Sequence, residues 1–247
     1  MKLTPLFLTA SLVLFFAPAV MMAQVNPRYW DGTGYLSITG GPASPGRDLS
    51  STTGNGLMAN NGLLADIDYN HMIAYGIGVG VNLGLDYFGM NEDIFLERTA
   101  PSTYNFTGGY LSGRLGLNLL MNLPVEILRD KFVLNFFGEL NGGLRSFTIP
   151  DVDLNYDELQ NKYTEVTYRS RSNVLGYAGY SAGVQFLFSN CWGINLSYSA
   201  LMKSQHRIDY SVRAVDVAGV VTEDEDFLSA RLDRTGIQIG FLFIIGR

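Results

Sequence analysis

A strict alternation of large apolar residues with small or polar ones is the feature that most constrains this chain. It runs through residues 73–87, and it returns near the C-terminus, where one face carries Ile237, Ile239, Phe241, Phe243 and Ile245. A two-residue period is that of a β-strand, because successive side chains point to opposite faces of a sheet. The recurrence of this pattern along the chain predicts an all-β protein.

The first 23 residues have the features of a secretory signal peptide. Lys2 supplies a positive charge, residues 6–20 are apolar, and Ala23 fits a cleavage position, with Ala17-Pro18-Ala19 as an earlier alternative. An uncleaved membrane anchor is the other reading, but the apolar run is short for a membrane helix. We therefore expect an exported protein in which residues 24–247 form a single domain.

Eight segments carry the alternation and are predicted to be strands: residues 33–41, 62–70, 73–87, 104–121, 132–147, 173–188, 192–203 and 228–245. Three predicted connections are short, at residues 70–72, 122–131 and 189–191. Four are long, at residues 42–61, 89–103, 148–172 and 204–227. Because short and long connections alternate, an up-and-down barrel would have its turns at one end and its long loops at the other.

Alternation alone does not say which face of a barrel points outward, since a soluble lipocalin-like barrel has the same period. Here the second face is rich in glycine, serine and asparagine, which suits a narrow lumen. Its charges have both signs: Asp66, Asp68, Asp86, Arg114, Glu139, Arg145, Lys203 and Arg234. Aromatic residues gather near strand ends, as at membrane interfaces. We assign Phe132, Phe188, Trp192 and Phe243 to one rim, and Tyr87, Tyr104 and Tyr110 to the other. The pattern favours an eight-stranded antiparallel up-and-down transmembrane β-barrel.

In this architecture, and in its terminal strand at residues 235–245, the chain resembles the eight-stranded outer-membrane barrels of Gram-negative bacteria. These are the OmpA/OmpX-like or porin-family barrels, and the resemblance covers the whole mature chain. It implies a place in the cell outer membrane, with periplasmic termini and extracellular long loops. It also implies contact with outer-membrane lipids and lipopolysaccharide, and insertion by the barrel-assembly machinery. The last aromatic residue usual in the family is displaced inward, because the chain ends Phe243-Ile244-Ile245-Gly246-Arg247.

The charges on the polar face form the candidate site. With the turn after the fourth strand centred near residue 126 or 127, Arg114 lies level with Glu139, and we expect the two to form an ion pair. Asp86, Arg145 and Arg234 are the further members of this predicted lumen charge network. An unpaired charge would be costly there, because few waters fit between eight strands.

No catalytic, cofactor or metal site is predicted. His71 lies at a predicted short turn, and His206, with Ser204 and Asp209 nearby, does not match a catalytic dyad on one strand face. The acidic run at residues 223–226 could bind Ca²⁺ through its oxygens, but such a run is more typical of a solvated loop. The single Cys191 excludes an internal disulfide, and the net charge of −6 argues against nucleic acid as a partner.

Side chains nearly fill the lumen of an eight-stranded barrel, so a wide pore is not expected. The sequence predicts a non-enzymatic outer-membrane protein that acts in envelope integrity, or in surface interaction with an extracellular partner through its four long loops. An accessory barrel of a secretion or assembly system and a narrow solute channel are the alternatives. A hydrolase at the rim, acting on lipid A or protein, is less favoured.

Overall fold

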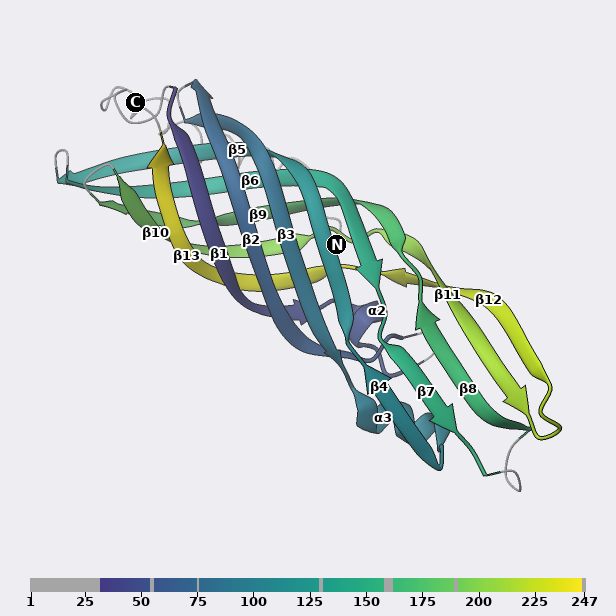
Figure 1. Ribbon diagram of the computed structural model, residues 1–247. Helices are drawn as coiled ribbons and strands as arrows, with labels where there is room; N and C mark the ends of the chain where they lie inside the picture. Colours follow the sequence, from purple (N-terminus) through teal and green to yellow (C-terminus); the bar gives the residue numbers. More distant parts are fainter. Residues whose placement is uncertain are drawn as a thin grey trace, which may run out of the picture.

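Eight strands close into an antiparallel barrel in the computed structural model (Figure 1). It describes residues 32–53, 56–74, 76–128, 131–157, 162–188 and 191–245, so the predicted signal peptide lies outside the described residues. The barrel strands are β1 (Gly34–Pro45), β2 (Ala59–Ala74), β3 (Ile77–Met90), β5 (Tyr110–Leu128), β6 (Phe132–Thr148), β9 (Asn173–Phe188), β10 (Trp192–Leu201) and β13 (Arg234–Ile245). Each pairs with its neighbours along the chain, and β1 pairs with β13 to close the ring. Closure leaves no edge strand among these eight strands.

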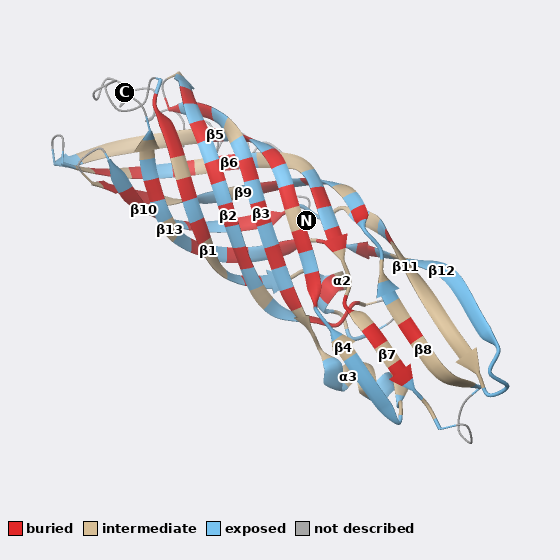
Figure 2. Ribbon diagram, viewed as in Figure 1, coloured by how far each residue is buried: buried red, intermediate tan, exposed pale blue. Residues whose placement is uncertain are grey.

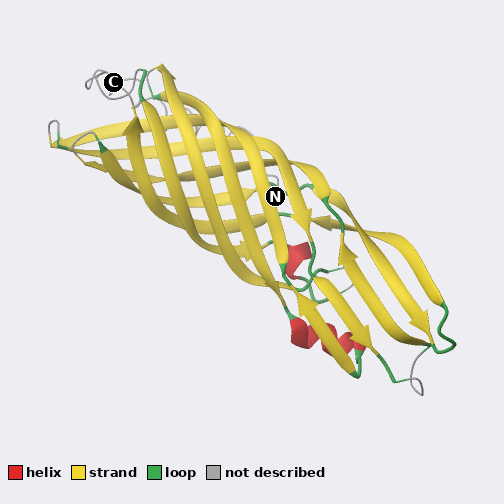
Figure 3. Cartoon of the chain, viewed as in Figure 1, coloured by secondary structure: helices red, strands yellow, loops and turns green. Residues whose placement is uncertain are grey.

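The long connections are not loose loops. Three of the four fold into a second, five-stranded antiparallel sheet, here called the distal sheet, whose order is β12-β11-β8-β7-β4. Its strands are β4 (Thr103–Thr107), β7 (Asp151–Asn155), β8 (Tyr163–Ser170), β11 (Gln205–Asp216) and β12 (Val221–Arg231). The distal sheet and the helix α3 (Glu92–Thr99) lie beyond one end of the barrel, and the short helix α2 (Arg47–Ser50) lies at that end, where Leu49 packs against barrel residues (Figure 3). None of the described helices is long and apolar enough to cross a membrane.

The turn between β2 and β3 lies later than predicted. β2 continues to Ala74 instead of ending at Asn70, and Gly76, with a φ of 81°, lies in the turn. Both strands place their odd-numbered residues outward, so the alternation passes through the turn without a change of phase. A glycine that adopts positive φ is the local signal that marks the break.

The turn between β5 and β6 is also misplaced in the prediction, and this changes the register. β5 runs to Leu128, so Arg114 lies level with Arg145, and Glu139 lies level with Leu120. Residues 122–128 extend past Met121, the last residue that pairs with β3. Pro124 therefore sits where β5 has an open edge, and there a residue without an N–H is tolerated in a strand.

Two predicted strands are each divided between the barrel and the distal sheet. Gly108, with a φ of 81°, separates β4 from β5. Residues 232–233 separate β12 from β13. Lys203, expected in the lumen, lies past the end of β10 and is exposed.

The two faces of the barrel wall have opposite character. Buried and exposed residues alternate along the barrel strands in Figure 2. The outward face carries large exposed apolar side chains on every strand of the ring, among them Ile38, Leu63, Val81, Leu117, Leu140, Val174, Leu196 and Ile239. The inward face is buried and largely polar, with Ser37, Asp66, Asn82, Ser112, Asn118, Asn135, Gln185, Asn195 and Gln238. An apolar belt around a polar lumen is the arrangement of a barrel in lipid, so we assign the outer face to the bilayer.

An aromatic rim marks the end of the barrel opposite the distal sheet. The ring of Phe188 lies 5.4 Å from that of Phe132 and 4.9 Å from that of Trp192, between centroids. Phe243 is level with Trp192, so the predicted rim at this end is present. The other predicted rim is wrong for two of its three members: Tyr110 is buried inside the barrel end, and Tyr104 belongs to the distal sheet.

A charge placed on the apolar belt tests this assignment of faces. Leu117 lies near the middle of the wall, is 70% exposed and pairs with Val81 of β3. Leu117→Arg should lower the free energy of unfolding in lipid vesicles by about 2–4 kcal/mol, because the arginine loses its hydration near the bilayer midplane. Leu117→Met keeps the site apolar and should cost less than about 1.5 kcal/mol. Urea titration followed by tryptophan fluorescence measures both, and equal stability of the two variants would contradict the lipid-facing assignment.

Candidate functional site

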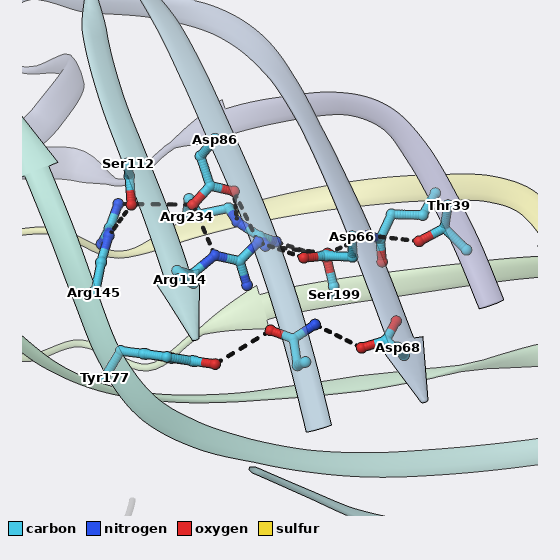
Figure 4. A network of polar contacts seen from close by, with 12 residues as sticks. Thr39, Asp66, Asp68, Asp86, Ser112, Arg114, Arg145, Tyr177, Ser199 and Arg234 are labelled. Carbon is cyan, nitrogen blue, oxygen red and sulfur yellow. Dashed lines mark hydrogen bonds and ion pairs between the residues drawn. The ribbon is translucent and has the colours of Figure 1, made fainter. Parts of the chain in front are cut away.

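Five charged side chains from five barrel strands meet in the half of the lumen nearer the distal sheet (Figure 4). Asp86 is fully buried at their centre, and its carboxylate lies 3.1 Å from Nε of Arg114 and 2.9 Å from Nε of Arg234. Nη2 of Arg145 is 3.9 Å from the same carboxylate. Asp66 adds a second carboxylate, 2.8 Å from Nη2 of Arg114 and 3.9 Å from Nη2 of Arg234. We call these five residues the lumen charge cluster.

Small residues on the same face make room for these side chains. Gly84 pairs with Asp66 on β2 and with Arg114 on β5. A Cβ atom on Gly84 would collide with both the Asp66 carboxylate and the Arg114 guanidinium. Gly84 therefore leaves the space that its two charged neighbours occupy.

Neutral partners accept further hydrogen bonds from two arginines. Nε of Arg145 donates to Oγ of Ser112 at 2.5 Å, and its Nη1 donates to the carbonyl of Leu232 at 2.5 Å. Nη1 of Arg234 donates to Oγ of Ser199 at 2.6 Å. Buried charges are tolerated when they are both paired and hydrogen-bonded, and this cluster meets most of that requirement.

The structure brings four of the five predicted network residues together and leaves Glu139 apart. The predicted Arg114–Glu139 ion pair is wrong, because the β5–β6 turn is later than expected and Arg114 is level with Arg145. Glu139 instead accepts a hydrogen bond from Nδ2 of Asn70 at 3.2 Å. Asp66 takes the place foreseen for Glu139. The alternation placed Asp66 on the polar face. Its pairing with Arg114 could not be predicted, because it depends on the register of β2, β3 and β5.

Two apolar clusters close the lumen at its ends. The distal apolar cluster combines barrel residues with residues of the long connections, and it contains Ala43, Leu49, Leu57, Ala59, Leu64, Phe88, Tyr110, Phe147, Ile208, Ala230 and Leu232. The proximal apolar cluster fills the opposite end with Tyr35, Met72, Leu120, Val133, Phe137, Leu187 and Leu242. Between them lie two small cavities, each with a volume of about 20 Å³. A volume of that size holds about one water, so the described lumen is packed rather than open.

Ion pairs connect neighbouring segments of the distal sheet. Arg213 lies 2.8 Å from Glu165, Arg171 lies 2.6 Å from Glu225, and Arg169 lies 2.7 Å from Asp153. The acidic run at residues 223–226 is part of β12, which forms one edge of the sheet and is exposed. Tyr210 donates a hydrogen bond to Asp226, and partial burial together with that carboxylate raises the pKa of Tyr210 to about 12. Glu223, Glu225 and Asp226 thus face arginine or tyrosine partners, and no group of three or more His, Cys, Asp or Glu able to hold a metal occurs in the described ranges.

The histidines do not assemble a catalytic triad. His71 lies within β2, level with Gly34 of β1 and Val79 of β3, rather than in a turn. Nε2 of His206 is 2.5 Å from Oγ of Ser204, a contact that the sequence did not predict. Asp209 pairs with Arg207 at 2.7 Å instead of orienting the imidazole. Partial burial and the Arg145 guanidinium hold the pKa of His206 below its ordinary value.

Comparison with known proteins gives likeness of fold at low identity. No known protein family matches the chain, and no curated protein matches it in sequence. The outer membrane protein OprG from Pseudomonas aeruginosa is similar with a TM-score of 0.47 at 12% identity, over 89% of this chain and 99% of OprG. Neisserial surface protein A gives 0.41 at 10% identity, over 86% and 97%. The attachment invasion locus protein Ail of Yersinia pestis gives 0.38 at 12%, over 86% and 99%. Similarity at this level assigns no function.

Double-mutant cycles separate the observed register from the predicted one. Arg114→Gln combined with Asp66→Asn should show a coupling above about 1 kcal/mol in unfolding free energy, because the two side chains form a buried ion pair. Arg114→Gln combined with Glu139→Gln should be additive within about 0.5 kcal/mol, because these residues share no contact. Both cycles are measured by urea unfolding in lipid vesicles. A larger coupling energy between Arg114 and Glu139 than between Arg114 and Asp66 would indicate that the β5–β6 turn lies near residue 126 or 127.

Proposed function

We propose that this chain is a non-enzymatic outer-membrane protein that presents the distal sheet as a folded interaction surface outside the cell. The observation that carries the proposal is the folding of three of the four long connections into one ordered sheet above a packed lumen. A barrel that lets solutes diffuse through it needs an open lumen. A barrel that binds a partner needs an ordered surface outside the membrane.

The direction of the barrel supports this location. Gly34 pairs with Ile245, so the two described ends of the chain lie together at the proximal end, opposite the distal sheet. A chain exported through the periplasm and inserted from that side leaves its termini there and its long connections outside. In this setting the apolar belt contacts outer-membrane lipid, the distal rim contacts lipopolysaccharide, and the barrel-assembly machinery acts during insertion.

The edge strand β12 is the part of the distal sheet best suited to contact a partner. Residues 221–227 are exposed, and their backbone groups pair with β11 on one side only. This edge carries three consecutive acidic residues, Glu223, Asp224 and Glu225. An exposed edge offers N–H and C=O groups to an added extended segment, and its charges favour a basic one. These features support recognition of a partner by the distal sheet.

Site-specific photo-crosslinking in the native envelope tests the proposal. A photoreactive phenylalanine analogue in place of Asp224 should give a discrete crosslinked species, because Asp224 lies on the free edge of β12. The same analogue in place of Glu97, an exposed residue of α3 outside the distal sheet, is the matched control and should give none. The purified protein should show no discrete conductance steps in planar bilayers. Equal labelling at both positions together with discrete conductance would contradict the proposal and favour a narrow solute channel.

A further inference from the structure

By formal charge, the buried side chains of the lumen carry one more negative charge than positive. Its buried charged residues are three arginines and four carboxylic acids: Arg114, Arg145, Arg234, Asp66, Asp68, Asp86 and Glu139. The lumen charge cluster contains all three arginines but only Asp66 and Asp86. Asp68 and Glu139 lie outside it, and neither is within ion-pair distance of an arginine or lysine of the described chain.

Side-chain donors reach both of these carboxylates. Asp68 accepts hydrogen bonds from Nδ2 of Asn82 at 2.6 Å, from Nδ2 of Asn118 at 3.3 Å and from Oγ of Ser37 at 3.3 Å. Glu139 accepts one from Nδ2 of Asn70, which reaches across from β2 to β6. These donors stabilise the ionised carboxylates, whereas burial and the proximity of a second carboxylate disfavour them, so two ionised groups here need a positive partner. Figure 4 shows Asp68 apart from the arginines.

Unsatisfied oxygen atoms surround the same region. Asn70 and Asn195 line one lumen cavity together with Asp68 and Glu139. Each of these asparagines is 5% exposed, and the Oδ1 atom of each is buried without a hydrogen-bond partner among the described residues. A buried amide oxygen without a partner is costly, and it needs either a donor or a cation. Two carboxylates and two free amide oxygens at one cavity form a set of hard oxygen ligands.

We propose that this cavity binds one small monovalent metal cation, of the size of Na⁺ or K⁺, between Asp68 and Glu139. The cavity of about 20 Å³ accepts one atom-sized occupant. A monovalent cation cancels the one excess negative charge, whereas a divalent cation would leave an excess positive charge. A water molecule could satisfy the amide oxygens but would leave the charge uncompensated. The bound cation links β2 to β6 across the lumen and stabilises the packed state.

Thermal unfolding in different salts provides the first test. At constant pH and ionic strength, replacing N-methylglucamine, which is too large for the cavity, by Na⁺ or K⁺ should raise the unfolding midpoint by about 3–6 °C, the shift expected for a tenfold excess over the dissociation constant. The readout is the heat-dependent mobility shift on gels. Glu139→Gln and Asp68→Asn each remove the excess charge and should abolish the shift. Glu97→Gln, on exposed α3, is the matched control and should retain it.

Three results would overturn the proposal. They are an equal midpoint in all salts, a cation effect that persists in Glu139→Gln, and a midpoint that depends on pH but not on the cation. The last would mean that the two carboxyl groups share a proton instead. If the variants fail to fold, crystals of the unaltered protein soaked in Tl⁺ decide. An anomalous peak between Asp68 and Glu139 supports the site, and its absence at that position overturns it.

Discussion

The pairing of β1 with β13 is the constraint on which the rest of this structure depends. Ten residue pairs join the first and last barrel strands and turn a sheet into a ring. Only a closed ring satisfies the backbone of every wall strand without water, so only a closed ring can carry an apolar belt on its outside. Closure at eight strands also fixes a narrow interior. The side chains of the polar face must therefore fit into this narrow interior, and its charged groups must pair with one another there.

The lumen charge cluster follows from that confinement. Asp86 and Asp66 neutralise most of the charge of three arginines, and Ser112, Ser199 and the Leu232 carbonyl accept further hydrogen bonds. Glycines such as Gly84 remove the Cβ atoms that would obstruct these contacts. The two apolar clusters then separate the polar interior from the aqueous phases at both ends. The described interior is therefore layered, apolar at both ends and charged between them.

Alternation predicted the strand faces well, because the side-chain period of a strand does not depend on its neighbours. The predicted segments at residues 132–147 and 173–188 match β6 and β9 to within one residue. Register was harder, since it depends on where each turn lies. The turn between β2 and β3 is hard to locate from the sequence, because odd-numbered residues point outward in both strands. The turn between β5 and β6 is hard to locate because Pro124 suggests the end of a strand, whereas β5 continues past the end of its pairing with β3. The resulting shift moved Arg114 from Glu139 to Asp66 and Asp86. The distal sheet was not predicted as a separate sheet, because residues 221–227 of β12 are all exposed, four of them are acidic, and they show no two-residue period.

Cysteine accessibility tests most directly whether the barrel has a lipid-facing exterior, a sealed lumen and an exposed distal sheet at one end. Cys191 is the chain's single cysteine, so a Cys191→Ser background is free of other thiols. Single cysteines are then placed by Leu117→Cys on the belt, Ser197→Cys in the lumen and Asp224→Cys on the distal sheet. Intact cells are treated with a charged, membrane-impermeant thiosulfonate. We expect rapid labelling at position 224 and none at positions 117 and 197. Labelling at position 197 as fast as at position 224 would mean an open lumen, and labelling at position 117 would mean that the apolar face does not lie in lipid.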